Sequence, residues 1–172
     1  MHPSDDGRHY MAAESLAGSA EASSVSENHD IPPTALRILV IDDEDAILHV
    51  MASLLRRAAY FVHCACDGEE GWKAFNEKTF DAVVTDHDMP RLSGLDLIRR
   101  VRAVSSNLPI VLISGRIPFG EVDLEALLRP GVIMQKPFTI DELITNVRAA
   151  FAQCEGLASN SQLTQQGSSD GS

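Results

Sequence analysis

Residues 82–94, AVVTDHDMPRLSG, bring an apolar run to an end on a carboxylate. The run leads directly into Asp86, and a second acid, Asp88, stands just before Met89-Pro90. A short continuous apolar run is typical of a strand that is buried on both faces. The two acids therefore follow a buried strand, and their presence at its end needs a chemical explanation.

The sequence around this stretch alternates between strand-like and helical patterns. Between the strand-like runs, apolar residues recur at helical spacing, as Ile47, Met51 and Leu55 do. Thr139 is a candidate N-cap of the last helix, with Glu142 at the capping-box position. The strand-like runs are LRILVID, YFVHCAC, FDAVVTD, LPIVLIS and GVIMQK. This alternation predicts an α/β fold, a (βα)₅ doubly wound parallel sheet with helices on both faces.

The chain divides into one folded region and two polar tails. Residues 1–34 are acidic and almost free of large apolar residues, and residues 154–172 are similarly polar, so we expect both segments to be disordered. Residues 35–153 are expected to form the domain. The polar segment after Phe151 leaves no room for an output domain, so signalling through contacts with other proteins is expected.

Composition excludes several classes of function. The 172-residue chain has a net charge of −11 and no basic segment, which disfavours direct binding of nucleic acid. No apolar run is long enough to cross a membrane, and the N-terminus has no apolar signal-peptide core, so we expect a cytoplasmic protein with no membrane contact. Cys64, Cys66 and Cys154 show no metal-ligand spacing and are expected to be ordinary reduced thiols.

Polar residues stand at the carboxyl ends of four predicted strands. Because those ends meet at one edge of a parallel sheet, the polar side chains should converge there. Carboxylates about 4 Å apart repel by roughly 4 kcal/mol at an effective dielectric of about 20, so grouping them requires a shared cation. Hard oxygen ligands of this kind favour Mg²⁺. The residues are Asp42 and Asp43, Asp86, Ser114, and Lys136 with Pro137.

This grouping can receive a phosphoryl group. Asp86 would be the nucleophile that attacks phosphorus and forms an acyl phosphate. Mg²⁺ and Lys136 would neutralise charge on the transferring oxygens, and the Ser114 hydroxyl could donate a hydrogen bond to the product.

The motifs LVIDDE, TDHDMPRLSG, LIS and QKPF resemble those of the receiver domain of two-component response regulators, over nearly all of residues 35–153. The resemblance implies a flavodoxin-like sheet with strand order 2-1-3-4-5 and a cis Lys136-Pro137 peptide. It also implies that Asp86 accepts phosphate from a phosphohistidine. The metal ligands it implies are Asp43, Asp86, the main-chain carbonyl of Asp88 and, through water, Asp42.

The remaining motif positions have expected structural or modulating roles. Pro90 should stiffen the loop after the acceptor, and Gly94 should permit close helix packing or an unusual backbone angle. Gly115 should leave room for a phosphoryl group. Asp88 and Arg116 are hypothesised to flank the phosphoryl group, where they could pair and change its lifetime. Ile133 stands where the family often has an aromatic switch residue.

The resemblance implies two kinds of partner, and two alternative functions stay open. The partners would be a sensor histidine kinase or a histidine phosphotransfer protein, which supplies phosphate, and a downstream protein target. The chain would be a phosphoacceptor that assists its own phosphorylation and slow dephosphorylation, not an enzyme acting on other substrates. One alternative is a phosphorylation-independent interaction module. The other is a haloacid-dehalogenase-type phosphatase, suggested by the Asp86-x-Asp88 spacing.

Overall fold

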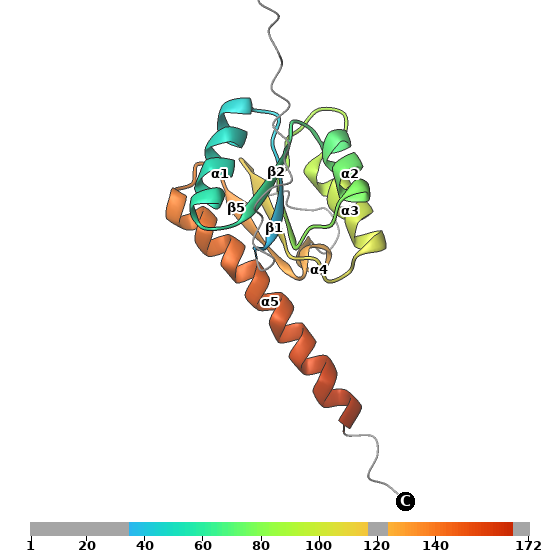
Figure 1. The fold of residues 1–172 in the computed structure, drawn as a ribbon. Coiled ribbons are helices and arrows are strands. Elements are labelled where there is room, and N and C mark those ends of the chain that lie inside the picture. Colours follow the sequence, from blue (N-terminus) through green and yellow to red (C-terminus); the bar gives the residue numbers. More distant parts are fainter. Residues whose placement is uncertain (1–34, 117–123, 167–172) are drawn as a thin grey trace, which may run out of the picture. The chain divides into compact units, whose positions relative to one another are not determined.

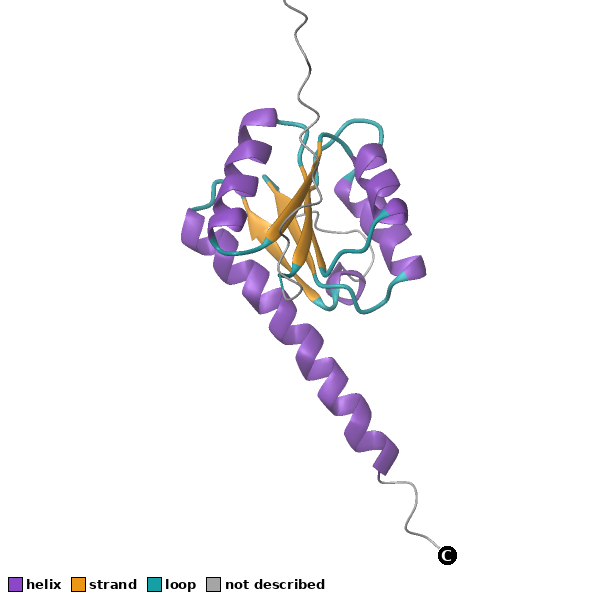
Figure 2. Cartoon of the chain, viewed as in Figure 1, coloured by secondary structure: helices purple, strands orange, loops and turns teal. Residues whose placement is uncertain are grey.

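A computed structural model describes residues 35–116 and 124–166, with side chains described up to Gly156. Five strands alternate with helices in this part of the chain, as the sequence predicts (Figures 1 and 2). The strands are β1 (Arg37–Ile41), β2 (Phe61–Ala65), β3 (Ala82–Asp86), β4 (Ile110–Ser114) and β5 (Gly131–Gln135). The helices are α1 (Asp45–Arg57), α2 (Gly68–Glu77), α3 (Gly94–Val104), α4 (Leu124–Leu128) and α5 (Ile140–Gln166).

All strand pairs are parallel, and the order across the sheet is β2-β1-β3-β4-β5. Every residue of β3 and β4 is buried, which explains why both read as continuous apolar runs. This arrangement is the doubly wound, flavodoxin-like fold expected from the sequence.

Two apolar clusters lie on opposite faces of the sheet. One is formed with α1 and α5 and includes Leu48, Met51 and Leu143. The other is formed with α2 and α3 and includes Leu95 and Ile98. The two groups of helices are visible on either side of the strands in Figure 2. Packing on both faces fixes the strands, and with them the residues at their carboxyl ends.

The helix starts follow from local side-chain chemistry. Thr139 and Glu142 form the expected capping box: the Thr139 N–H donates to Glu142 Oε2 at 2.6 Å, and the Glu142 N–H donates to Thr139 Oγ1 at 3.3 Å. Ser93 caps α3 by accepting from the Asp96 N–H. Gly94 begins α3 where a Cβ would overlap the main-chain carbonyl oxygen of Asp86, so close helix packing is the reason for this glycine.

The last helix differs from the prediction. The sequence placed the end of the domain at Gln153 and a disordered tail after it, whereas α5 continues to Gln166. Extending an existing helix adds one hydrogen bond for each residue fixed, so a polar segment can continue a helix that it could not nucleate. The predicted N-terminal tail, residues 1–34, and residues 117–123 and 167–172 lie outside the described residues. Within the described part, no helix has both the length and the apolar character that a bilayer-spanning segment needs.

Candidate functional site

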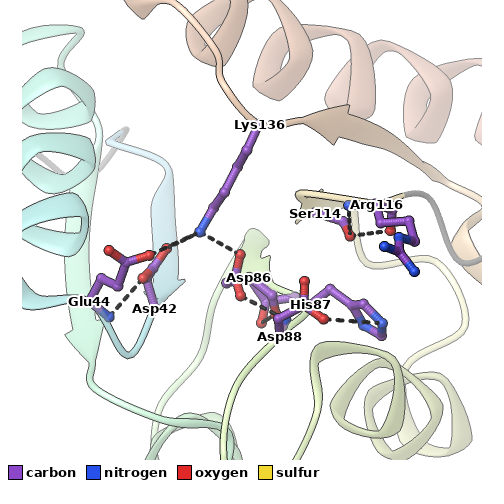
Figure 3. A network of polar contacts seen from close by, with 9 residues as sticks. Asp42, Glu44, Asp86, His87, Asp88, Ser114, Arg116 and Lys136 are labelled. Atoms are coloured by element: carbon purple, nitrogen blue, oxygen red, sulfur yellow. Dashed lines mark hydrogen bonds and ion pairs between the residues drawn. The ribbon is translucent and has the colours of Figure 1, made fainter.

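Two buried carboxylates lie at the carboxyl ends of neighbouring strands (Figure 3). Asp42 follows the last residue of β1 and is fully buried, and Asp86 is the last residue of β3 with 2% exposure. Because β1 and β3 pair in parallel, their ends bring both acids to the same edge of the sheet. The convergence inferred from the sequence is therefore present for this pair.

Lys136 bridges these acids. It follows β5, and its Nζ lies 2.8 Å from Asp86 Oδ1, 3.6 Å from Asp42 Oδ2 and 3.7 Å from Glu44 Oε1. Burial alone lowers the pKa of Lys136, but contact with Asp86 and the other two acids outweighs burial and raises that pKa above its usual 10.5. The ammonium is therefore held in its charged form. The Lys136-Pro137 peptide is cis, as the family resemblance implies.

Asp42 has an unsatisfied oxygen. Its Oδ1 accepts a hydrogen bond from the Glu44 N–H at 2.9 Å, but its Oδ2 is buried without a hydrogen-bond partner. Burial raises the pKa of Asp42 above its usual 3.8, and the Glu44 N–H and the charge of Lys136 do not cancel this effect. A buried acceptor without a hydrogen bond is costly even with the Lys136 ammonium 3.6 Å away, so this oxygen favours binding of a further cation.

The loop after β3 is folded back onto the acceptor strand. The Asp88 N–H donates to Asp86 Oδ2 at 2.7 Å, and the Gly94 N–H donates to the His87 carbonyl at 3.0 Å. The Asp88 carboxylate is 69% exposed and lies 3.9 Å from His87 Nε2. The loop therefore fixes the orientation of the Asp86 carboxylate through the Asp88 main chain, whereas the Asp88 side chain points elsewhere.

Ser114 is buried at the end of β4, and its hydroxyl forms hydrogen bonds within the loop that follows. Its hydroxyl donates to the Arg116 carbonyl at 2.5 Å and accepts from the Arg116 N–H at 3.2 Å. Gly115 faces open space, since a Cβ there would meet no atom within 4 Å. The expected pairing of Asp88 with Arg116 is not present in the described residues: Asp88 lies against His87, and Arg116 contacts Ser114 through its main chain. The effect of Arg116 on the lifetime of the acyl phosphate stays a prediction that does not depend on this pair.

Asp43 and Glu44 complete the acidic edge. Asp43 is exposed and directly follows the buried Asp42. Glu44 was missed as a site residue, although it contacts Lys136 and donates its N–H to Asp42. Glu44 is the last residue of the motif LVIDDE, so its position next to Asp42 and Asp43 could have identified it as a site residue. Together these residues offer the carboxylate oxygens that Mg²⁺ prefers, and the unsatisfied oxygen of Asp42 makes the donor set a good fit for that ion.

Replacing Asp42 with asparagine is expected to stabilise the metal-free protein near neutral pH by about 1–2 kcal/mol, because it removes a buried, incompletely satisfied carboxylate. The folded-state pKa of Asp42 is raised, so the contribution of Asp42 to the free energy of unfolding falls as the pH rises above 3.8 through that pKa. The advantage of Asp42→Asn should therefore shrink as the pH is lowered toward 3.8. Urea unfolding in a chelator at several pH values measures this. A variant that is less stable than wild type at neutral pH would contradict it.

Comparison with known proteins assigns a family. A model described as response regulator receiver domain matches residues 38–148. The chain is 35% identical over 118 residues to YkoG, an uncharacterized transcriptional regulatory protein of Bacillus subtilis, covering 67% of this chain and 51% of that protein. It is 31% identical over 137 residues to the transcriptional regulatory protein PrrA of Mycobacterium tuberculosis, covering 78% and 58%. The chain spans about half the length of these curated relatives.

Solved structures agree with this assignment. The response regulator TrrA from Thermotoga maritima, in complex with Mg²⁺ and BeF, aligns with a TM-score of 0.60 at 30% identity, covering 67% of this chain and 98% of that one. The chemotaxis response regulator CheY4 of Vibrio cholerae aligns with a TM-score of 0.62 at 26% identity, covering 68% and 99%. The sheet order, the acidic strand ends and these matches agree: the chain belongs to the response regulator receiver domain family and contains a receiver domain of the two-component type.

Proposed function

We propose that Asp86 accepts a phosphoryl group from a phosphohistidine on a sensor histidine kinase or a histidine phosphotransfer protein, in the presence of Mg²⁺. The observation that carries this proposal is the buried Asp86 carboxylate, 2.8 Å from the Lys136 ammonium and next to the unsatisfied oxygen of Asp42. In the transfer, a carboxylate oxygen of Asp86 forms a bond to phosphorus. The bond from phosphorus to the donor histidine nitrogen breaks, and its electron pair stays on the imidazole.

Each residue of the site has a proposed task. Lys136 neutralises the Asp86 carboxylate before transfer and the phosphoryl oxygens afterwards. The Ser114 hydroxyl exchanges the Arg116 carbonyl for a phosphoryl oxygen, and Gly115 leaves space beside it. Arg116 modulates access to the acyl phosphate from outside the pocket.

Mg²⁺ would be held by oxygens of the same edge. The proposed ligands are Asp43, Asp86 and the main-chain carbonyl of Asp88, with Asp42 acting through water. When bound, the ion supplies positive charge that offsets the charge on the reacting oxygens. The relative TrrA is described in complex with Mg²⁺ and BeF, which supports a magnesium site in this family.

An apolar groove beside Lys136 supports a protein donor. The groove has a volume of about 570 Å³ and is bounded by α1 and the segment after β5. Its lining residues are Ala46, Ile47, Val50, Met51, Lys136, Pro137 and Phe138. A histidine on another protein can reach Asp86 only if that protein covers the surface around Lys136. We therefore propose that a helix bearing the phosphohistidine docks in this groove.

A charge placed in the groove should slow phosphoryl transfer from protein donors but not from small-molecule donors. Val50 is 57% exposed, so Val50→Glu should leave the fold intact. Transfer from a cognate kinase or phosphotransfer protein should slow at least about tenfold, since a buried charge in an apolar contact is costly, while labelling by acetyl phosphate stays unchanged. Val104→Glu, at a 65% exposed valine of α3, is the matched control. Equal transfer to both variants would exclude this groove.

Incubation of the wild-type protein with Mg²⁺ and acetyl phosphate tests the proposed function. One phosphoryl group on Asp86, dependent on Mg²⁺ and detected by intact-mass and peptide analysis, is the expected result. Rapid turnover of phosphate esters would instead indicate a phosphatase, and no reaction would indicate a phosphorylation-independent module. The exposure of the Asp88 carboxylate and its contact with His87 give no support to the general-acid role that a phosphatase would need.

We further propose that the phosphorylated domain signals through contacts with other proteins.

A further inference from the structure

The loop after Asp86 contains a residue in an unfavourable backbone conformation. Arg91 has φ 68°, a left-handed value that residues other than glycine seldom adopt. It lies at the turn of the loop that starts at His87 and ends where Ser93 caps α3. Within the loop, the Leu92 N–H donates to the Pro90 carbonyl at 2.8 Å across Arg91, and a contact from outside the loop adds to this hold.

The side chain of Arg91 provides that contact. Its guanidinium donates to Asp67 Oδ2, and the two form an ion pair. Asp67 is 9% exposed and its other oxygen caps α2, accepting from the Glu69 N–H at 2.8 Å and the Glu70 N–H at 2.9 Å. The Glu70 N–H and the charge of Arg91 keep the pKa of Asp67 low despite burial. One carboxylate thus ties the start of α2 to the loop that follows the acceptor.

The two loops are also in close contact through their main chains. A Cβ at Gly68, next to Asp67, would overlap the carbonyl oxygen of Leu92, next to Arg91. Leu92 is 4% exposed and Met89 8%, so the loop is packed onto the domain on both sides of Arg91. A displacement of Arg91 would therefore move the whole loop, including the main chain of Asp88.

We propose that Arg91, held by Asp67, is a positioning residue that presets the Asp88 main-chain carbonyl for Mg²⁺. This inference rests on the proposed function, because it assumes the magnesium site described there. Residues that orient metal ligands typically change metal affinity about 10–100-fold when they are replaced. Asp67 and Arg91 are not among the proposed magnesium ligands or the reacting groups, so their effect should be on magnesium affinity and not on the rate of transfer at saturating Mg²⁺.

Calorimetric titration of Mg²⁺ into the full chain tests the proposal. Arg91→Gln removes the guanidinium charge that pairs with Asp67. Asp67→Asn keeps the α2 cap, since asparagine is also a good N-cap, but turns a donor toward Arg91. Both should bind Mg²⁺ about tenfold more weakly than wild type. Arg91→Lys should restore most of the affinity. Arg100→Gln is the matched control, because Arg100 forms a 3.3 Å ion pair with Glu69 that links α2 to α3 without involving the loop.

A second readout separates positioning from general destabilisation. The Mg²⁺ concentration for half-maximal labelling by acetyl phosphate should rise in Arg91→Gln and Asp67→Asn, with an unchanged rate at saturation and a urea midpoint equal to that of Arg100→Gln. If the wild type binds Mg²⁺ and both variants match Arg100→Gln in affinity, the inference is overturned. If the wild type binds no Mg²⁺, the proposed function fails first and this inference falls with it.

Discussion

Asp86→Asn is expected to abolish phosphorylation by acetyl phosphate completely. The amide oxygen of asparagine is a poor nucleophile, and the other buried carboxylate that contacts Lys136 in the described residues, Asp42, lies farther from its ammonium, at 3.6 Å against 2.8 Å for Asp86. Intact-mass analysis after incubation with Mg²⁺ and acetyl phosphate measures the effect. Asp81→Asn is the control, because Asp81 is an exposed acid that immediately precedes β3, at the end of the strand remote from Asp86.

The Asp81→Asn protein should be labelled like the wild type. Because asparagine is close in shape to aspartate, Asp86→Asn should remain folded, which circular dichroism and urea unfolding can check. A folded Asp86→Asn protein that still gains one phosphoryl group would mean that another residue is the acceptor, and the proposed role of Asp86 would be wrong.

Lys136→Met should have the second largest effect. Methionine keeps the alkyl chain but removes the cation that lies between Asp42, Asp86 and Glu44. Removing one partner of a buried ion pair typically costs about 3–5 kcal/mol, because it leaves a buried charge without compensation. We expect a loss near the lower end of that range in the free energy of unfolding at neutral pH without Mg²⁺, since Lys136 is 23% exposed.

Two conditions should reduce that loss. Mg²⁺ replaces the missing positive charge, so it should stabilise Lys136→Met more than it stabilises the wild type. Acidification should also help, because protonation of Asp42, whose pKa is raised by burial, removes one of the uncompensated charges. Labelling by acetyl phosphate should still fall about 100-fold at saturating Mg²⁺, because a charge that stabilises the transferring group is gone.

Lys73→Met, at an exposed lysine of α2, is the control for both measurements. Equal stability of Lys136→Met and Lys73→Met without Mg²⁺ would show that Lys136 does not neutralise the buried acids.

The sequence predicted the fold and the convergence of Asp42, Asp86 and Lys136 for clear physical reasons. Strands buried on both faces read as uninterrupted apolar runs, and β3 and β4 are fully buried as expected. The carboxyl ends of parallel strands share one edge, so Asp42, Asp86 and Lys136 could be placed together before their distances were known. The capping box of Thr139 and Glu142 was predictable because both partners lie within one helical turn.

Contacts that depend on main-chain geometry were not predictable. The Ser114 hydroxyl donates to the main-chain carbonyl of Arg116. Every residue has such a carbonyl, so the sequence does not indicate which one the hydroxyl will contact. The ion pair between Arg91 and Asp67 forms with Arg91 in a left-handed backbone conformation. Arginine seldom adopts that conformation, so the residue type does not predict it. Arg102 is a further case, since its guanidinium donates only to main-chain carbonyls in the described residues, those of Ser105, Leu108, Leu127, Leu128 and Pro130.

A crystal structure of the protein grown with Mg²⁺ and beryllium fluoride tests the magnesium-assisted acceptor site most directly. We predict a beryllium–oxygen bond to the Asp86 carboxylate, Mg²⁺ on Asp43, Asp86 and the Asp88 carbonyl, and Lys136 turned from the carboxylates to the fluoride atoms. Beryllium fluoride absent from Asp86, with Lys136 still bridging Asp42 and Asp86 and no metal beside them, would contradict it.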